Sequence, residues 1–162
     1  MEFAQHVPTI RLRNGAALPS LGLGTWPMNG EEASKTIVSA IDAGYRLFDT
    51  AESYGNEASV GEGLKRSGVD RSEIFITSKF DKQWHSVEGV RQAFAGATER
   101  LGVDYLDMFM VHWPVPEQGR FIDAVEGLVE LRRDGRIRAI GTSNFKPNHL
   151  RTMSDVGLVP DV

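Results

Sequence analysis

Cysteine is absent from this sequence of 162 residues, and its absence excludes disulfide bonds, catalysis by a cysteine thiolate and zinc sites built on cysteine. Long apolar runs are also missing, since no stretch approaches the ~18 residues of a membrane-spanning helix. Positive charge is scarce: 18 lysines and arginines against 22 aspartates and glutamates give a net charge of -4. Such a chain offers no basic surface for nucleic acid or an anionic membrane, and the cytoplasm is its expected location.

The four histidines do not form a pattern that is typical of a metal site, because they fall in separate segments without ligand spacing. They are His6, His85, His112 and His149. Hydrophobic residues make up 41% and charged residues 25% of the chain, which is a globular composition. The length then predicts one domain over residues 1–162.

Apolar segments alternate with helical patterns along the chain. The first feature is a predicted β-hairpin over residues 9–19, in which Asn14-Gly15 forms a two-residue turn because both residues tolerate positive φ angles. Five strand–helix units follow over residues 20–158, and residues 159–162 begin a sixth strand. The strands of these units are expected at 20–24, 45–48, 73–77, 106–111 and 137–140.

Helix boundaries are marked by capping residues and glycines. Ser86 is suited to begin a helix that Gly102 ends, and Pro147 fits the first turn of another helix. Further helices are expected at 31–43, 57–66 and about 122–132. Strict alternation of strand and helix predicts a parallel sheet with right-handed crossovers. Periodicity alone leaves two α/β architectures open, a doubly wound sheet and a (β/α)8 barrel.

Polar side chains follow the expected strands at their carboxyl ends. Asp49 follows the second strand, with Tyr54 in the loop beyond it. Lys79 follows the third strand and His112 the fourth. In a parallel α/β structure these ends share one rim, and active sites lie on that rim. We therefore expect the four side chains to converge.

The four side chains suit the reduction of a carbonyl group. The Tyr54 hydroxyl is a weak acid at neutral pH, and a nearby ammonium group such as that of Lys79 favours its phenolate. Asp49 would keep Lys79 charged and oriented, and neutral His112 would hydrogen-bond a substrate oxygen. Such groups protonate an oxygen that gains negative charge. Because no side chain delivers hydride, the chemistry requires a cofactor.

Each of these residues has an ordinary explanation when it is taken alone. An aspartate after a strand is more often a turn or capping residue than a catalytic one, and lysines are usually solvated. Gly22 and Gly24 lack the third glycine of a dinucleotide-binding fingerprint. The convergence of four such side chains on one rim favours the functional interpretation.

Four segments resemble signatures of the aldo-keto reductases, and they occur in the order of that family. The first contains Phe48-Asp49-Thr50-Ala51-Glu52-Ser53-Tyr54-Gly55-Asn56-Glu57. The others are Ile76-Thr77-Ser78-Lys79, Val111-His112-Trp113-Pro114 and Arg138-Ala139-Ile140-Gly141-Thr142-Ser143-Asn144-Phe145. Several independent matches are more specific than any single motif.

The resemblance implies a (β/α)8 barrel of the TIM type whose base is closed by the N-terminal hairpin. It also implies NADPH-dependent reduction of aldehydes or ketones, with NADH as the alternative cofactor. By matching position, Tyr54 is the implied general acid, Asp49 and Lys79 support it, and His112 orients the carbonyl. Matching positions also place Gly24, Thr25 and Asp49 near the nicotinamide ribose, Ser143 and Asn144 at the carboxamide, and Trp26 and Trp113 in the wall of the substrate pocket.

The length departs from the family, because barrels of this type need ~250 residues. We therefore expect the N-terminal portion of a longer enzyme, about its first five βα units, which is monomeric when complete. Two alternatives stay open: a truncated fragment without catalysis, and a non-enzymatic binding protein like the potassium-channel β subunits. The short connection over residues 114–120 resembles bacterial enzymes and argues against the channel subunit. The sequence does not identify the carbonyl substrate.

Overall fold

The computed structural model describes residues 8–162, so the first seven residues of the predicted domain, including His6, lie outside the described part. A parallel sheet of five strands forms its centre, in the order β3-β4-β5-β6-β7. The strands are β3 (Gly22–Gly24), β4 (Leu47–Asp49), β5 (Phe75–Phe80), β6 (Leu106–Val111) and β7 (Ile137–Thr142).

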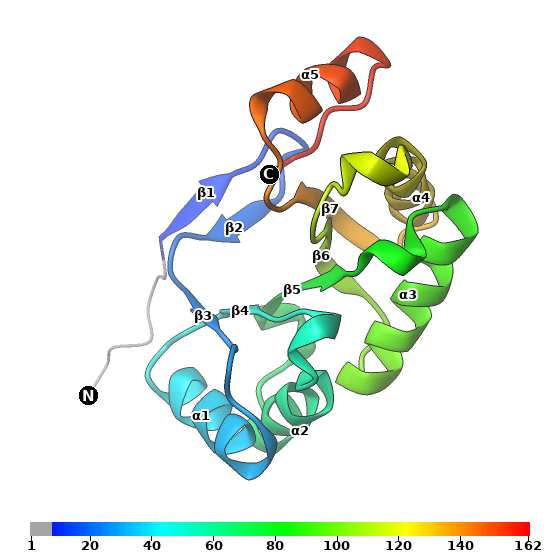
Figure 1. The fold of residues 1–162 in the computed structure, drawn as a ribbon. Coiled ribbons are helices and arrows are strands. Elements are labelled where there is room, and N and C mark those ends of the chain that lie inside the picture. The colour runs from blue at the N-terminus through cyan, green and yellow to red at the C-terminus, as the bar shows by residue number, and fades with distance from the viewer. Residues whose placement is uncertain (1–7) are drawn as a thin grey trace.

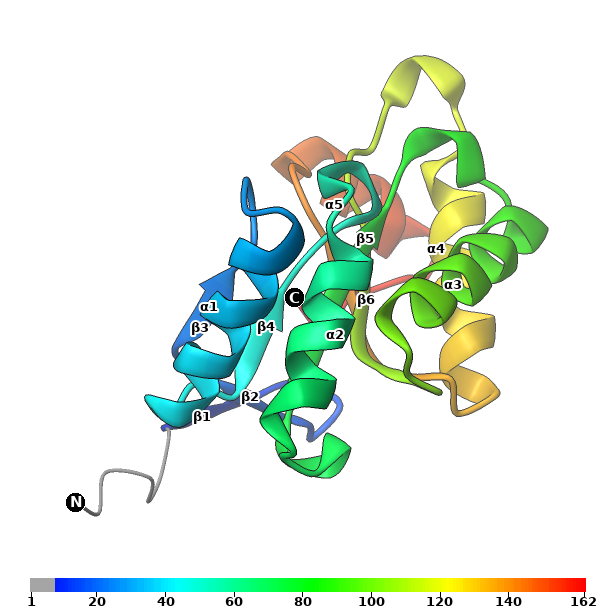
Figure 2. The same ribbon diagram turned by 90° about the horizontal axis from the view of Figure 1, so that it is seen from below.

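Four helices cover one face of this sheet (Figure 1), and the view in Figure 2 shows α1 and α2, then α3 and α4, side by side. Because the strand order follows the sequence without reversal and the helices lie on one face, the sheet is a section of barrel wall. A doubly wound sheet would carry helices on both faces. The helices are α1 (Gly30–Asp42), α2 (Glu57–Ser67), α3 (Val87–Leu101), α4 (Phe121–Arg133) and α5 (Pro147–Asp155), with short 3-10 turns η1 (Glu52–Tyr54), η2 (Arg71–Glu73), η3 (Lys82–Trp84) and η4 (Pro116–Gln118).

The predicted helix ends are confirmed where a capping residue marked them. The Ser86 hydroxyl accepts a hydrogen bond from the Gly89 amide at 2.9 Å, which satisfies a donor that the first turn of α3 leaves free. Gly102 ends α3 with φ +68°, a left-handed conformation that glycine adopts without steric cost. Pro147 stands in the first turn of α5, as predicted.

Apolar side chains form one cluster on each face of the sheet. The larger cluster joins the helices to the sheet and includes Phe48, Ile76 and Phe109, all fully buried. The smaller cluster lies under the antiparallel hairpin of β1 (Thr9–Arg11) and β2 (Ala17–Pro19), where Leu12 packs with Met108. Figure 1 shows the hairpin on the side of the sheet opposite the helices, where it covers the inner face.

The turn of the hairpin differs from the predicted two-residue turn. The Gly15 amide donates to the Leu12 carbonyl and the Leu12 amide donates to the Ala16 carbonyl, both at 2.9 Å, so the loop contains three residues. Only Gly15 has a positive φ, +88°, and the Asn14 side chain instead accepts a bond from the Ala16 amide. A type I turn followed by a left-handed glycine produces this geometry.

Several predicted strand ends were wrong. Strand β4 includes Asp49 and strand β5 runs to Phe80, so Asp49 and Lys79 lie inside their strands and do not follow them. Strand β7 continues to Thr142, two residues beyond its predicted end. Residues 159–162 form no regular strand, although the Thr142 amide donates to the Val162 carbonyl at 2.9 Å. The Asp161 carboxylate accepts the Ile140 amide at 2.9 Å and so takes a donor that a neighbouring strand would use.

We expect an added methyl group to affect the stability of the fold differently at two helical glycines. A Cβ at Gly61 of α2 would overlap the backbone carbonyl of Leu101, which cannot move aside without shifting α3. We expect Gly61→Ala to lower the free energy of unfolding by ~1–3 kcal/mol, because overpacking outweighs the higher helix propensity of alanine. Gly96→Ala in α3 is the matched control, since its Cβ meets only the flexible end of Arg100 at 2.8 Å. Urea denaturation would measure both, and equal stability of the two variants would contradict this packing argument.

His85 predicts a loss of stability at acidic pH. The ring is 2% exposed against Phe80, with neither nitrogen hydrogen-bonded in the described part of the chain. Burial lowers the pKa of His85, opposed by the charge of Asp81. Its contribution to stability is therefore complete above the unfolded pKa of ~6.5 and declines as the pH falls through the lower folded pKa.

We therefore expect the free energy of unfolding to fall as the pH drops below the unfolded pKa of ~6.5 toward the lower folded pKa, at up to ~1.4 kcal/mol per pH unit for each proton taken up. His85→Gln removes the titrating ring and should flatten this profile in urea denaturation at a series of pH values. An unchanged profile would show that the acid sensitivity arises elsewhere. The control is His149→Gln, a buried histidine whose Nδ1 is already occupied by the Lys146 amide at 3.1 Å.

Candidate active site

The four side chains predicted to converge do meet at the carboxyl ends of the strands. The ammonium group of Lys79 lies 2.7 Å from Oδ2 of Asp49 on the neighbouring strand. It also donates to the Thr50 carbonyl at 3.0 Å and lies 3.4 Å from the Tyr54 hydroxyl. Lys79 is 8% exposed and Asp49 39% exposed, so the ion pair leads from the interior to the rim.

Asn56 fixes the loop that carries Tyr54, although it was not predicted as a site residue. Its side chain, 1% exposed, donates to the carbonyls of Thr25 and Met28 at 2.9 Å each and accepts from the Thr50 hydroxyl at 3.0 Å. It therefore joins the loop after β3 to the loop after β4. Nothing in the sequence indicated this bridging role.

Glu52 connects the same loop to the segment that follows β5. Its carboxylate accepts the indole N–H of Trp84 at 2.9 Å and the Asp81 amide at 3.2 Å. The turn η1, which contains Tyr54, is thereby held against η3. Neither Glu52 nor Asp81 was predicted, because their partners lie 29 to 32 residues apart in the sequence.

His112 follows β6 and is 12% exposed in its side chain. Its ring meets the ring of Tyr54 edge-on, with 5.9 Å between the centroids. Burial lowers the pKa of His112, and the nearby charge of Lys79 lowers it further, while Asp81 and Asp49 oppose both effects. The ring is therefore neutral at neutral pH.

Ser143 and Asn144 follow β7 and lie beside His112. The Asn144 side-chain amide donates to the His112 carbonyl at 2.9 Å and to the Ser143 hydroxyl at 3.0 Å. Asn144 has φ +63°, a left-handed conformation that asparagine tolerates better than most residues. Both amide hydrogens are thus in use, which leaves the Asn144 oxygen as an acceptor and the Ser143 hydroxyl as a donor.

The remaining predicted positions lie at the end of β3 or follow β3 and β6. Gly24 pairs with Asp49 in the sheet and has open space where a Cβ would stand. The Thr25 amide donates to the Asp49 carbonyl at 3.0 Å, and the Thr25 hydroxyl is buried without a partner in residues 8–162. Trp26 and Trp113 expose 68% and 54% of their surface, so both rings are accessible at this rim.

A cavity of about 640 Å³ is lined by neighbours of His112 but not by His112, Asp49, Tyr54 or Lys79. Its wall joins segments that follow β5, β6 and β7, and Trp113 and Asn144 belong to it. Asp81 lines it as well, so the carboxylate that faces His112 also faces this space. Trp26 does not line this cavity.

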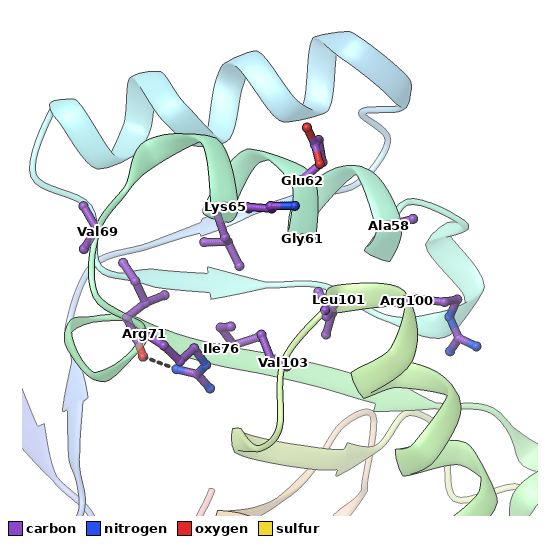
Figure 3. Close-up of a pocket in the computed structure, with 13 residues that line it drawn as sticks. Ala58, Gly61, Glu62, Lys65, Val69, Arg71, Ile76, Arg100, Leu101 and Val103 are labelled. Carbon is purple, nitrogen blue, oxygen red and sulfur yellow. Dashed lines mark hydrogen bonds between the residues drawn. The ribbon is translucent and has the colours of Figure 1, made fainter.

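A second cavity, of about 410 Å³, lies between α2 and the end of α3, and no predicted site residue lines it (Figure 3). Of the three cationic side chains that line it, Arg71 pairs with Asp107 at 2.8 Å and Arg100 with Glu57 at 2.7 Å, whereas Lys65 has no ion pair within residues 8–162. Within residues 8–162, no group of acidic or histidine side chains is arranged for a metal ion. No helix in that range has the length and apolar character needed to cross a membrane.

Residues 19–161 match the model of the aldo/keto reductase family. A protein of Mycobacterium sp. (strain KMS), described as an aldo-keto reductase, is 44% identical over 159 residues, which are 96% of this chain and 56% of that protein. An aldo-keto reductase of Mycolicibacterium smegmatis is 43% identical, with 96% of this chain and 57% of that protein covered. The chain thus spans little more than half the length of these relatives.

Solved structures agree with this assignment. The aldo/keto reductase from Brucella melitensis superposes with a TM-score of 0.92 at 37% identity, covering 97% of this chain and 60% of that one. The Bombyx mori aldo-keto reductase in complex with NADP gives 0.87 at 31% identity, covering 96% of this chain and 56% of that one. The five strand–helix units are thus a partial TIM barrel of this kind, and the chain belongs to the aldo/keto reductase family.

Proposed function

We propose that the protein containing this chain reduces aldehydes or ketones to alcohols with NADPH. One observation supports this above all: a buried ammonium group lies between a carboxylate and a tyrosine hydroxyl on the rim where active sites of barrels are found. Relatives crystallised with NADP or NADPH support the choice of cofactor, and NADH remains the alternative. The partner we propose is a small carbonyl compound, bound by a protein that acts as a monomer.

Tyr54 is the proposed general acid. Its hydroxyl would donate a proton to the carbonyl oxygen as that oxygen gains negative charge. The ammonium group of Lys79, 3.4 Å away, stabilises the phenolate that remains. Asp49 at 2.7 Å and the Thr50 carbonyl at 3.0 Å hold Lys79 in place, so its position does not depend on the substrate.

His112 is the proposed hydrogen-bond donor that orients the carbonyl. Its lowered pKa keeps the ring neutral, so the proton comes from Tyr54 and not from an imidazolium. A neutral ring with its proton on Nε2 can donate to the carbonyl oxygen. Trp113 and the adjacent cavity provide apolar surface for the rest of the substrate.

The donors and acceptors at the rim fit a nicotinamide cofactor, which supplies the hydride when bound. Its carboxamide requires one donor and one acceptor, and the Ser143 hydroxyl and the Asn144 oxygen provide that pair. Gly24 leaves room for close approach, and the unpartnered Thr25 hydroxyl and the exposed Asp49 oxygen suit ribose hydroxyl groups. The cofactor's other contacts would come from parts of the enzyme outside this chain.

Tyr54→Phe tests the proton donor in the natural-length protein. We expect kcat for carbonyl reduction to fall ~100- to 10,000-fold because the general acid is lost, while the affinity for NADPH, measured by fluorescence, stays the same. Tyr45→Phe is the matched control, since Tyr45 packs against the helix-side core and not at the rim. Its turnover should be unchanged.

Retained turnover in Tyr54→Phe would refute the acid assignment. A wild-type protein that binds NADPH but reduces no aldehyde or ketone would instead indicate a binding protein built on the same barrel. Failure to bind NADPH would refute the cofactor assignment.

A further inference from the structure

The ring of His112 has two neighbours that the proposed reaction does not use. The hydroxyl of Ser53 lies 3.3 Å from Nδ1, and Oδ1 of Asp81 lies 3.4 Å from the same nitrogen. Ser53 comes from η1 and Asp81 from the segment after β5, so two elements converge on one atom. Nε2 makes no hydrogen bond within residues 8–162, which leaves it available to a substrate.

Ser53 and Asp81 differ in the hydrogen bond that each can form with Nδ1. A serine hydroxyl can donate to a nitrogen lone pair, whereas a carboxylate can only accept. Ser53 therefore suits a ring whose Nδ1 carries no proton. Asp81 suits a ring whose Nδ1 is protonated. In the neutral ring, a hydrogen bond from Ser53 to Nδ1 leaves the proton on Nε2, the form that donates to a carbonyl oxygen.

Glu52 holds both neighbours in position. It precedes Ser53 in the chain, and its carboxylate accepts the Asp81 amide at 3.2 Å and the Trp84 indole at 2.9 Å. The backbone that carries Ser53 and the backbone that carries Asp81 are thus tied to one carboxylate. The contacts with His112 are consequently part of a supported arrangement that reaches from η1 to η3.

We propose that Ser53 and Asp81 are positioning residues that set the proton arrangement of His112. Ser53 donates a hydrogen bond to Nδ1 of the neutral ring and keeps the proton on Nε2. When the ring takes up a second proton, Asp81 accepts a hydrogen bond from the Nδ1–H that forms. The catalytic meaning of this arrangement rests on the proposed carbonyl reduction, but the arrangement itself is a property of the protein alone.

Charged groups around His112 determine the pH at which its ring becomes protonated. Lys79 on β5 disfavours the protonated ring, whereas Asp81 and Asp49 favour it, and Tyr54 packs against it edge-on. Because Asp81 is the carboxylate that faces Nδ1 directly, its charge should have the larger effect of the two carboxylates. Its removal should move the titration of His112 to lower pH.

Nitrogen-15 NMR of the histidine side chains tests the role of Ser53 in the natural-length protein, with His112 assigned from His112→Gln. In the wild type at neutral pH we expect the pattern of a ring protonated on Nε2 alone. Ser53→Ala should shift both nitrogens toward the average of two neutral forms, and Ser53→Thr, which keeps the hydroxyl, should restore the wild-type pattern. Ser154→Ala, on the exposed face of α5, is the control and should change nothing.

The same measurement over a range of pH tests Asp81. Asp81→Asn should lower the titration midpoint of His112, whereas Asp155→Asn, which removes an exposed carboxylate of α5, should leave it in place. An unchanged pattern in Ser53→Ala would overturn the role of Ser53, and an unchanged midpoint in Asp81→Asn would overturn that of Asp81. Because no turnover is measured, these outcomes are independent of whether the protein reduces carbonyls.

Discussion

The ion pair between Lys79 and Asp49 is the interaction on which the rim depends. An ammonium group that is 8% exposed is costly unless it is paired and hydrogen-bonded. Here the cost is offset by Asp49 on the adjacent strand and by the Thr50 carbonyl just after it. Both partners belong to the chain segment that leads to Tyr54. The ammonium group of Lys79 on β5 thus fixes the start of the loop that carries Tyr54, the proposed general acid.

Two polar side chains, buried Asn56 and half-buried Glu52, then fix the rest of that loop. Asn56 attaches it to the segment after β3, and Glu52 attaches it to the segment after β5. A loop with such attachments on both sides cannot shift without breaking the hydrogen bonds of Glu52 and leaving the buried Asn56 amide unsatisfied, and the loss at Asn56 costs ~1–3 kcal/mol. Tyr54 therefore occupies a position that the fold sets before any substrate arrives. Preorganisation of this kind is what proton transfer to a developing oxyanion requires.

Sequence patterns predicted the elements because their signals are local. The cap at Ser86 and the glycine at Gly102 act within one helical turn, and both were confirmed. The rim residues Asp49, Tyr54, Lys79 and His112 were also predictable, because parallel strands bring their carboxyl ends to one edge whatever the details of packing.

The sequence predicted less where distant side chains decide the structure. Asp81 could not be linked to His112 by spacing, and spacing did not show that the Asp161 carboxylate would bond to the Ile140 amide 21 residues away. Lys79 was predicted to follow the third strand, whereas β5 contains it. Within the strand, Ser78 bonds to Glu57 and Lys79 to Asp49. Buried partners from other elements thus override the local preference of polar residues for loops.

The two ends of the sheet differ in how fully their polar groups are paired. At the amino end, Asp107 is 1% exposed and is bound by Arg71 at 2.8 Å, Arg138 at 2.9 Å and the Ile76 amide at 2.9 Å. Both guanidinium groups also lie over the ring of Tyr105, so this cluster is saturated by the protein itself.

At the carboxyl end, hydrogen-bonding capacity is left over. The Ser143 hydroxyl keeps its proton to donate, the Asn144 oxygen can still accept, and Nε2 of His112 makes no bond within residues 8–162. A saturated cluster stabilises the fold, whereas groups with unused capacity on a rigid support can bind a ligand. This difference between the two ends supports the carboxyl end of the sheet as the place where we propose that substrate and cofactor bind.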